Sequence, residues 1–290
     1  LIQAELTQDK YVRNTRKGEN EIYEVTAANS PNVMREIGRL RELSFRAAGG
    51  GTGKALDIDE FDLDPNNPYR QLIVWDPNEQ EIIGGYRYLV GTEIIPEQLA
   101  TRELFQFSDS FVNEYLPKTI ELGRSFIQPG YQGTSTRRKG LYSLDNLWDG
   151  LGALVVLNPK VRYLFGKVTM YTDFNVEARN MIIYFMHRYF PDHDELMEGI
   201  DPVEMDIDYE KYDAMFTGDN YNEDHRTLCQ QVRERGENIP PLINSYMGIS
   251  PSMRTFATVH NNDFGAVEET GILITIADIY PAKGERHMKF

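Results

Sequence analysis

The chain has 290 residues, 41% of them hydrophobic and 26% charged, which is enough apolar material for the sizeable core of a globular protein. Its formal net charge is −15 and it has no basic stripe that could neutralise phosphates, which excludes a nucleic-acid-binding protein. The single cysteine, Cys229, excludes an internal disulfide and suits the cytoplasm, and the longest apolar run, Leu151–Leu157, is too short to span a bilayer, so we expect peripheral membrane contact at most.

The first half of the chain predicts a strand, a helix and a hairpin. Residues 1–20 are polar and of mixed charge, so we expect an N-terminal arm, and residues 21–26 predict the first strand. A helix is predicted at about 31–47, because a proline follows a capping serine and apolar residues then recur at helical spacing. The runs Gln71–Asp76 and Glu81–Val90 flank a Pro-Asn pair and predict an antiparallel hairpin.

The second half continues the alternation of strands and helices. A short amphipathic segment is expected at about 96–115. The remaining predicted elements are strands at 119–127, 162–171, 255–259 and 271–276 and helices at about 141–157 and 176–190. This order favours a mixed α/β fold in one domain that covers residues 21–290.

Most of the net negative charge lies in one segment. Between Asp192 and Asp224 there are thirteen Asp or Glu residues and a single lysine, Lys211. Such a density of like charge is typical of a solvated surface. We therefore expect an acidic, helical insertion at about 191–238.

Two segments resemble known ligand-binding loops but lack residues that those loops require. Gly49–Ala55 looks like a phosphate-binding loop, but the required first Gly and final Ser or Thr are replaced by Ala48 and Ala55, and the segment follows a helix. Asp57–Asp64 looks like the start of a calcium loop, but its turn position holds Asp62 instead of glycine. Its five carboxylates still repel one another, so a solvated loop and a packed loop paired with arginines both remain open.

The strand at 119–127 carries two charges within an otherwise apolar run, Glu121 and Arg124. Buried charges cost several kcal/mol, of order 3–5, unless they are paired or used in chemistry. Because strand side chains alternate between faces, the two point in opposite directions unless a bulge intervenes, and each then needs its own partner. A structural ion-pair network and a catalytic pair both remain open.

A basic, glycine-containing loop follows this strand and precedes a helix. It contains Gly130, Gly133 and Gly140 together with the cationic run Arg137-Arg138-Lys139. Backbone amides at the start of a helix bind anions, so the loop suits a pyrophosphate or phosphopantetheine group. An ordinary basic surface loop is the alternative.

These motifs, in this order, resemble the GNAT acyltransferase superfamily. The closer resemblance is to the branch of acyl-homoserine-lactone synthases and of the hemolysin-like N-acyltransferases that make amino-acid lipids. The segments that carry it are Arg41-Glu-Leu-Ser-Phe45, Asp59-Glu-Phe-Asp62, Gly84-Gly-Tyr-Arg87-Tyr-Leu89 and Glu121-Leu-Gly-Arg124, and Tyr163–Gly166 and Pro240–Tyr246 favour the lipid branch. The resemblance covers roughly residues 21–280.

The resemblance implies a fold and a reaction. The fold would be a GNAT-like mixed sheet flanked by helices and splayed beside the strand at 119–127 to admit an acyl-pantetheine arm. The reaction would move a fatty acyl group from acyl carrier protein, or from acyl-CoA, to the amine of an amino acid such as glycine or ornithine. The pyrophosphate signature of the superfamily is missing, with only Arg137–Gly140 near it, which favours the carrier protein over coenzyme A. No metal and no permanently bound cofactor is implied.

The resemblance also implies roles for single residues. Glu121 is expected to be the base, and backbone amides near Phe126 and Ile127 are expected to stabilise the oxyanion. An ion-pair lattice is expected to shape the acceptor pocket, with Phe45 beside it, and one of its arginines could instead hold the acceptor's carboxylate. The expected lattice residues are Arg41, Asp59, Asp62, Arg87 and Arg124, and the residues expected to bind the donor arm are Phe126, Ile127, Gly133, Arg137, Arg138 and Gly140.

Two other functions remain open. The first is a short-chain acyl-CoA N-acetyltransferase on the same fold. The second is a non-catalytic, membrane-lytic role of the kind that the hemolysin label suggests, although no cationic amphipathic segment supports it.

Overall fold

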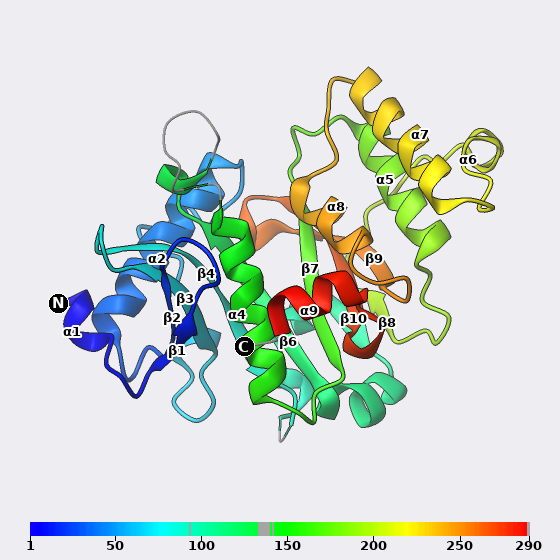
Figure 1. The fold of residues 1–290 in the computed structure, drawn as a ribbon. Helices are drawn as coiled ribbons and strands as arrows, with labels where there is room; N and C mark the ends of the chain where they lie inside the picture. Colours follow the sequence, from blue (N-terminus) through cyan, green and yellow to red (C-terminus); the bar gives the residue numbers. More distant parts are fainter. Residues whose placement is uncertain (93, 133–139, 141, 289–290) are drawn as a thin grey trace. The chain divides into compact units, whose positions relative to one another are not determined.

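The computed structural model describes residues 1–92, 94–132, 140 and 142–288, which form two compact units (Figure 1). The first unit contains Leu1–Ala100, Leu116–Arg162 and the C-terminal segment that begins at Pro281. The second unit contains Thr101–Tyr115 and Tyr163–Tyr280. Among the described residues, no helix is long and apolar enough to cross a membrane.

The first unit contains an antiparallel sheet. Its strands are, in spatial order, β1 (Tyr11–Asn14), β2 (Glu21–Val25), β3 (Arg70–Asp76), β4 (Glu81–Val90) and β6 (Thr119–Ile127). β3 and β4 form the hairpin that the sequence predicts. Both strands are buried almost throughout, because each face of this sheet is covered by a helix.

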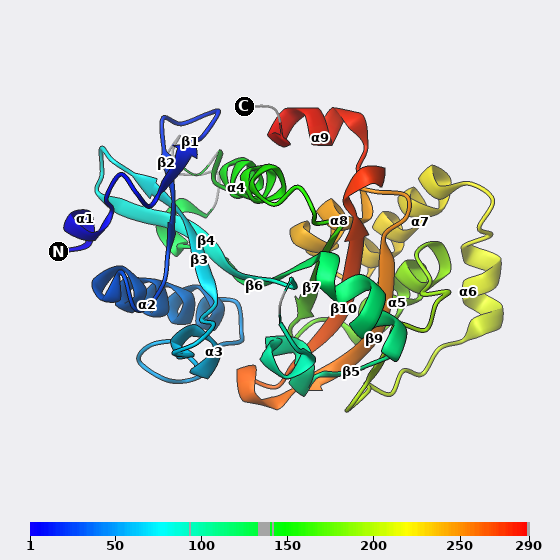
Figure 2. The same ribbon diagram turned by 90° about the horizontal axis from the view of Figure 1, so that it is seen from below.

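Helix α2 (Pro31–Ala47) covers one face, and α4 (Ser143–Leu157) covers the other (Figure 2). Val33, Met34, Ile37 and Leu40 recur on one side of α2 and pack with Tyr23, Val25, Ile73, Trp75, Ile82 and Phe126 of the sheet. On the opposite face, Gly150 of α4 lies against Leu72 and Tyr86. Helix α9 (Pro281–Met288) packs on α4, where His287 Nδ1 lies 2.9 Å from Asp149 Oδ1.

A β-bulge interrupts the pairing of β4 with β6. Gly85 is paired with Phe126 and Arg87 with Gly123, so Tyr86 alone lies opposite two residues, Arg124 and Ser125. Arg124 has a φ of 50°, a left-handed conformation that costs about 1–3 kcal/mol in a residue other than glycine. The bulge turns Arg124 away from strict alternation and toward the α2 face, where Glu121 and Arg87 also point.

Glycine is required on the partner strand beside this bulge. A Cβ atom on Gly84 would lie 2.4 Å from the carbonyl oxygen of Phe126, and one on Gly85 would lie 2.5 Å from that of Leu72. Backbone atoms cannot move aside as a flexible side chain can. The two glycines of β4 therefore allow the close approach of β6 at the point where it bulges.

The second unit has a three-stranded antiparallel sheet in the order β7 (Tyr163–Met170), β10 (Val267–Thr275) and β9 (Arg254–Asn261). A small pair, β5 (Phe105–Phe107) and β8 (Met197–Gly199), lies beside it, and Phe165 contacts the rings of Phe107 and Phe111. The helices of this unit are α5 (Val176–Tyr189), α6 (Tyr209–Met215), α7 (Tyr221–Glu234) and α8 (Pro241–Met247).

The structure confirms most of the predicted elements and corrects two, the N-terminal arm and the acidic segment. Residues 1–20 are not a free arm, since they form α1 (Ile2–Glu5) and β1, and β1 pairs with β2. Residues 96–115, expected as a short amphipathic segment, form short helical turns and β5. The acidic segment is helical only in α6 and α7, because its first part contains β8, whose pairing with β5 satisfies its backbone.

Candidate active site

A cluster of charged side chains is buried beneath α2, in the first unit. We call it the ionic cluster, and its members are Arg41, Asp57, Asp59, Asp62, Gln71, Arg87, Glu121 and Arg124, with Tyr69 between Arg87 and Glu121. Buried charges are stable only when they are paired and hydrogen-bonded. The pairings of this cluster therefore decide what it can do.

Helix α3 (Glu60–Leu63) positions two of the carboxylates, those of Asp59 and Asp62. Asp59 caps it by accepting a hydrogen bond from the backbone N–H of Asp62 at 3.2 Å, and the Asp62 carboxylate accepts one from the N–H of Asp59 at 3.3 Å. This reciprocal capping box fixes the short helix at its first turn. The acidic loop is thus packed and paired with arginines, and is not a solvated loop.

Asp62 lies at the centre of the ionic cluster and is fully buried. Its carboxylate lies 3.0 Å from Arg41 Nη1 and 3.3 Å from Arg87 Nη1, and it accepts a hydrogen bond from Gln71 Nε2 at 2.9 Å. Burial alone would raise the pKa of Asp62, but the two arginines outweigh it and lower that pKa to about 2. Asp62 is therefore a charged structural centre and is a poor proton acceptor at neutral pH.

Arg87 links the carboxylates to the aromatic side chains. Its Nη1 donates to both oxygens of Asp59, at 2.6 and 2.8 Å, and its guanidinium lies 4.9 Å from the ring centre of Tyr69 and 5.7 Å from that of Phe61. Burial opposes its charge, yet Asp62 and Asp59 raise its pKa above the ordinary value. Arg87 is thus permanently charged.

Arg124 and Asp57 form an ion pair of a different kind. Arg124 Nε lies 3.1 Å from Asp57 Oδ2, and its Nη2 lies 3.6 Å from Asp59 Oδ2. Within the described part of the chain, neither carboxylate oxygen of Asp57 accepts a hydrogen bond. Burial raises the pKa of Asp57 and lowers that of Arg124, so desolvation here outweighs the mutual attraction.

Glu121 is buried at the edge of the ionic cluster next to a phenol. The hydroxyl of Tyr69 donates a hydrogen bond to Glu121 Oε2, and the backbone N–H of Ala100 lies 2.8 Å from the Tyr69 oxygen and 3.3 Å from the carboxylate. Burial, and then the charge of Glu121, raises the pKa of Tyr69 well above its usual value. The pair is therefore a carboxylate held by a neutral hydroxyl, an arrangement suited to proton transfer.

The structure brings together six of the residues that the sequence singles out, namely Arg41, Asp59, Asp62, Arg87, Glu121 and Arg124. Phe45 packs at the margin of the core beneath α2, and Phe126 lies within that core. The carbonyl of Ile127 accepts a hydrogen bond from Ser44 Oγ at 3.1 Å. Gly140 is half-buried ahead of α4, whereas Gly133, Arg137 and Arg138 lie outside the described residues.

Three members of the ionic cluster are absent from the sequence-based set of site residues: Asp57, Tyr69 and Gln71. Gln71 carries a usable signal, because it is a polar residue in the apolar run of β3 and lies directly opposite Arg87 in the sheet. Tyr69 carries no such signal, since a tyrosine directly before a strand is ordinary.

The glycine-rich loop after α2 is filled by a side chain of the protein itself. The carboxylate of Glu42 accepts hydrogen bonds from the N–H groups of Thr52 and Gly53, at 3.0 and 2.9 Å, and from the Thr52 hydroxyl at 2.8 Å. The Glu42 carboxylate thus occupies the position that an anion would take in this loop. This agrees with the sequence, which lacks the residues of a phosphate-binding loop. Among the described residues, no group of three or more His, Cys, Asp or Glu side chains is arranged to hold a metal ion.

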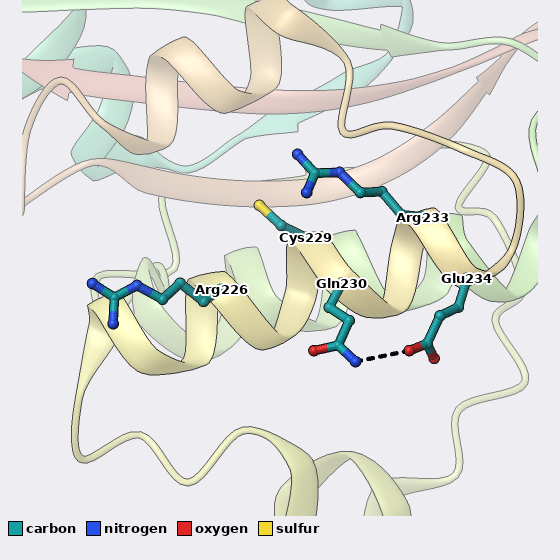
Figure 3. A pocket seen from close by; sticks show the side chains of 5 residues that line it. All are labelled: Arg226, Cys229, Gln230, Arg233 and Glu234. Carbon is teal, nitrogen blue, oxygen red and sulfur yellow. Dashed lines mark hydrogen bonds between the residues drawn. The ribbon is translucent and has the colours of Figure 1, made fainter.

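A pocket on the exposed side of α7 is a weaker candidate for an active site than the ionic cluster. Figure 3 shows Cys229 between Arg226 and Arg233 on this helix, with Gln230 Nε2 donating to Glu234 at 2.9 Å. Its charged side chains are exposed to solvent. Because solvent screens exposed charges, they are poor catalysts compared with a buried carboxylate. The ionic cluster is thus the better candidate for an active site.

Comparison with known proteins points in the same direction. The model of the family described as "Acetyltransferase (GNAT) domain" matches residues 40–139, which include every member of the ionic cluster. The chain is 52% identical over 294 residues to a glycine N(alpha)-acyltransferase of Phocaeicola vulgatus, covering 100% of this chain and 90% of that protein. It is also 52% identical over 294 residues to a glycine N(alpha)-acyltransferase of Bacteroides thetaiotaomicron, covering 100% of this chain and 87% of that protein.

A solved structure is also similar in part. FeeM, an N-acyl amino acid synthase from uncultured soil microbes, is 10% identical with a TM-score of 0.39, and the match covers 91% of this chain and 97% of that one.

Proposed function

The chain belongs to the family of the glycine N-acyltransferases, and from this premise we propose that it transfers a fatty acyl group from an acyl thioester to the α-amine of glycine. The membership itself makes it a GNAT-type N-acyltransferase. The observation that carries the choice of acceptor is the 52% identity to glycine N(alpha)-acyltransferases over the whole of this chain.

The reaction needs a base near the attacking amine. An amine attacks a thioester carbonyl only as the neutral base, and it must lose a proton as the tetrahedral intermediate forms. Glu121 is the group we assign to take that proton, directly or through a water molecule. Its support is its burial together with the hydrogen bond from Tyr69, which orients the carboxylate and can relay a proton.

The developing oxyanion needs donors. We assign this role to backbone N–H groups near Phe126 and Ile127, which directly follow the bulge of β6. Phe126 and Ile127 themselves lie opposite Gly85 and Gly84 of β4, and the support for the assignment is that the ladder is interrupted directly before them, at Arg124 and Ser125. The thiolate then leaves with the pantetheine arm, and the acyl group remains on the amine.

The donor in this proposal is acyl carrier protein rather than coenzyme A. The sequence lacks the pyrophosphate signature of the superfamily, and it has one run of three consecutive cations, Arg137-Arg138-Lys139. A carrier protein is generally acidic, so an enzyme of net charge −15 needs a local basic patch to receive it. We propose that the enzyme works in the cytoplasm, with peripheral membrane contact at most.

The test is an assay of the purified protein with glycine and two donors, a long-chain acyl carrier protein and acetyl-CoA. We expect N-acylglycine from the carrier-bound donor. The double variant Arg137→Glu/Arg138→Glu should raise KM for the carrier in a salt-dependent way, while exposed Arg39→Glu on α2 is the matched control. Turnover of acetyl-CoA without use of the carrier would favour the short-chain acetyltransferase, and no turnover of any amine would favour a non-catalytic role.

A further inference from the structure

We propose, on the basis of the function above, that Arg124 binds the carboxylate of the acceptor amino acid and that Asp57 is an internal stand-in which this carboxylate displaces. The ionic cluster contains three arginines, and a carboxylate of the substrate could in principle pair with any of them. The structure distinguishes the three by exposure, by hydrogen bonding and by backbone geometry.

Arg41 and Arg87 are already bound to side chains of the protein. The side chain of Arg41 is 0% exposed and that of Arg87 is 5% exposed, whereas that of Arg124 is 14% exposed. Arg41 hydrogen-bonds to Asp62 and Gln71, and Arg87 hydrogen-bonds to both oxygens of Asp59. Removing either from its partner would strand a buried carboxylate, so neither is available to a substrate without a large cost.

Arg124 differs from the other two arginines in its ion-pair distances and in its backbone conformation. Its Nε lies 3.1 Å from Asp57 and its Nη2 lies 3.6 Å from Asp59, whereas Arg87 lies 2.6 Å from Asp59 and Arg41 lies 3.0 Å from Asp62. Its backbone is in the left-handed region at the bulge, and strain of this kind persists only where the surrounding structure imposes it, often at functional sites. The bulge thus presents a partly exposed guanidinium on the same face as the base.

Asp57 has the properties of a replaceable partner. Its backbone is fixed, because its N–H donates to the carbonyl of Gly38 at 3.0 Å and its own carbonyl lies 3.5 Å from Arg41 Nη1. Its carboxylate has no such anchor, since in the described residues neither oxygen accepts a hydrogen bond. The backbone therefore places the Asp57 carboxylate next to Arg124, and the attraction of opposite charges holds that carboxylate there.

Exchange of one carboxylate for another preserves the charge balance around Arg124. An incoming carboxylate can also make the bidentate hydrogen bonds with the guanidinium that Asp57 does not make. Burial already raises the pKa of Asp57, so the displaced carboxyl group can be held as the neutral acid. A short amino acid bound in this way would carry its amine on the face of the sheet that holds Glu121.

The test compares glycine with glycinamide, which has the same amine but no carboxylate. We would measure kcat and KM for both acceptors, with one long-chain acyl donor, for the wild type, Arg124→Lys, Asp57→Asn and the control Arg70→Lys. Arg70 is an exposed arginine of the same sheet whose partner, Glu24, lies outside the ionic cluster. Melting temperatures would establish that each variant is folded.

We expect the wild type to prefer glycine by about 10²-fold or more in kcat/KM, since a site built for a polar group rejects an analogue that lacks it. Arg124→Lys should lose most of this preference through KM for glycine, with glycinamide turnover within about 3-fold of the wild type. Asp57→Asn should lower KM for glycine, because the internal competitor is gone, and Arg70→Lys should change nothing.

Three outcomes would overturn the inference. A wild type that uses glycinamide as well as glycine does not recognise the carboxylate at all. An Arg124→Lys variant that loses both acceptors equally shows a structural role. A wild type that acylates neither acceptor, yet uses another amine, overturns the proposed acceptor, and with it the need for a carboxylate site.

Discussion

Tyr69 and Glu121 are 52 positions apart in the sequence, and the hydroxyl of Tyr69 donates a hydrogen bond to the Glu121 carboxylate. The ring of Tyr69 also lies beneath the guanidinium of Arg87, 4.9 Å away. Tyr69 thereby connects the proposed base to the ionic cluster without adding a charge. Changes at this residue should thus separate catalysis from stability.

Replacing Glu121 with glutamine should keep the fold and remove most turnover. The amide preserves the size of the side chain but cannot take a proton, and loss of a general base typically costs about 10²–10⁴-fold in kcat. Steady-state kinetics near neutral pH and the melting temperature would be measured together. A near-normal rate would contradict the assignment, and a collapse of the melting temperature would make Glu121 structural.

Tyr69→Phe should lower kcat by a smaller factor, about 10-fold, with KM for the acceptor nearly unchanged. The substitution removes the hydroxyl that orients Glu121 but leaves the ring that packs beneath Arg87. A comparison with Tyr69→Leu, which removes the ring as well, separates the two contributions. If the phenylalanine variant is fully active, the hydroxyl has no part in the proton transfer.

Asp62→Asn should be among the most destabilising single changes in the first unit. It leaves two buried arginines short of a carboxylate, and breaking a buried ion pair costs about 3–5 kcal/mol. Urea denaturation of Asp62→Asn, Arg41→Met and the double variant would give their coupling energy. Strictly additive losses would argue against the pairing of Arg41 with Asp62.

The contribution of Asp62 should also depend on pH. Its pKa falls from the ordinary 3.8 to about 2 in the folded protein, so its stabilisation is complete above about pH 4 and is lost as the pH falls toward 2. The unfolding free energies of wild type and Asp62→Asn should therefore converge in acid by up to about 2 kcal/mol. Denaturation curves at pH 6 and pH 3 would measure this change, and a constant difference would contradict it.

Gly84→Ala should destabilise the protein and lower its activity. The added Cβ would lie 2.4 Å from the carbonyl oxygen of Phe126, so β6 must move at the bulge that positions Arg124, at a cost of about 1–3 kcal/mol. Gly130→Ala is the matched control, because its Cβ would meet nothing closer than 3.9 Å. Equal melting temperatures and rates for the two variants would remove the proposed role of Gly84.

The sequence by itself determines the elements with a strong local pattern. The helix at 31–47 and the hairpin of β3 and β4 follow from apolar periodicity and turn residues, which act over a few neighbouring positions. The sequence also predicts that the positive and negative charges of the site are paired. An arginine on α2, an acidic loop and a charged pair in the strand at 119–127 require one another once they are buried.

Only the tertiary structure decides which charge meets which. Strict alternation sends Glu121 and Arg124 to opposite faces, and the bulge that brings them together depends on the approach of Gly84 and Gly85 from β4. The hydrogen bond of Tyr69 to Glu121 likewise arises from the packing of segments that are distant in sequence. Alternation is a local property of one strand, whereas a bulge and its partners are set by the pairing of two strands, which no single segment encodes.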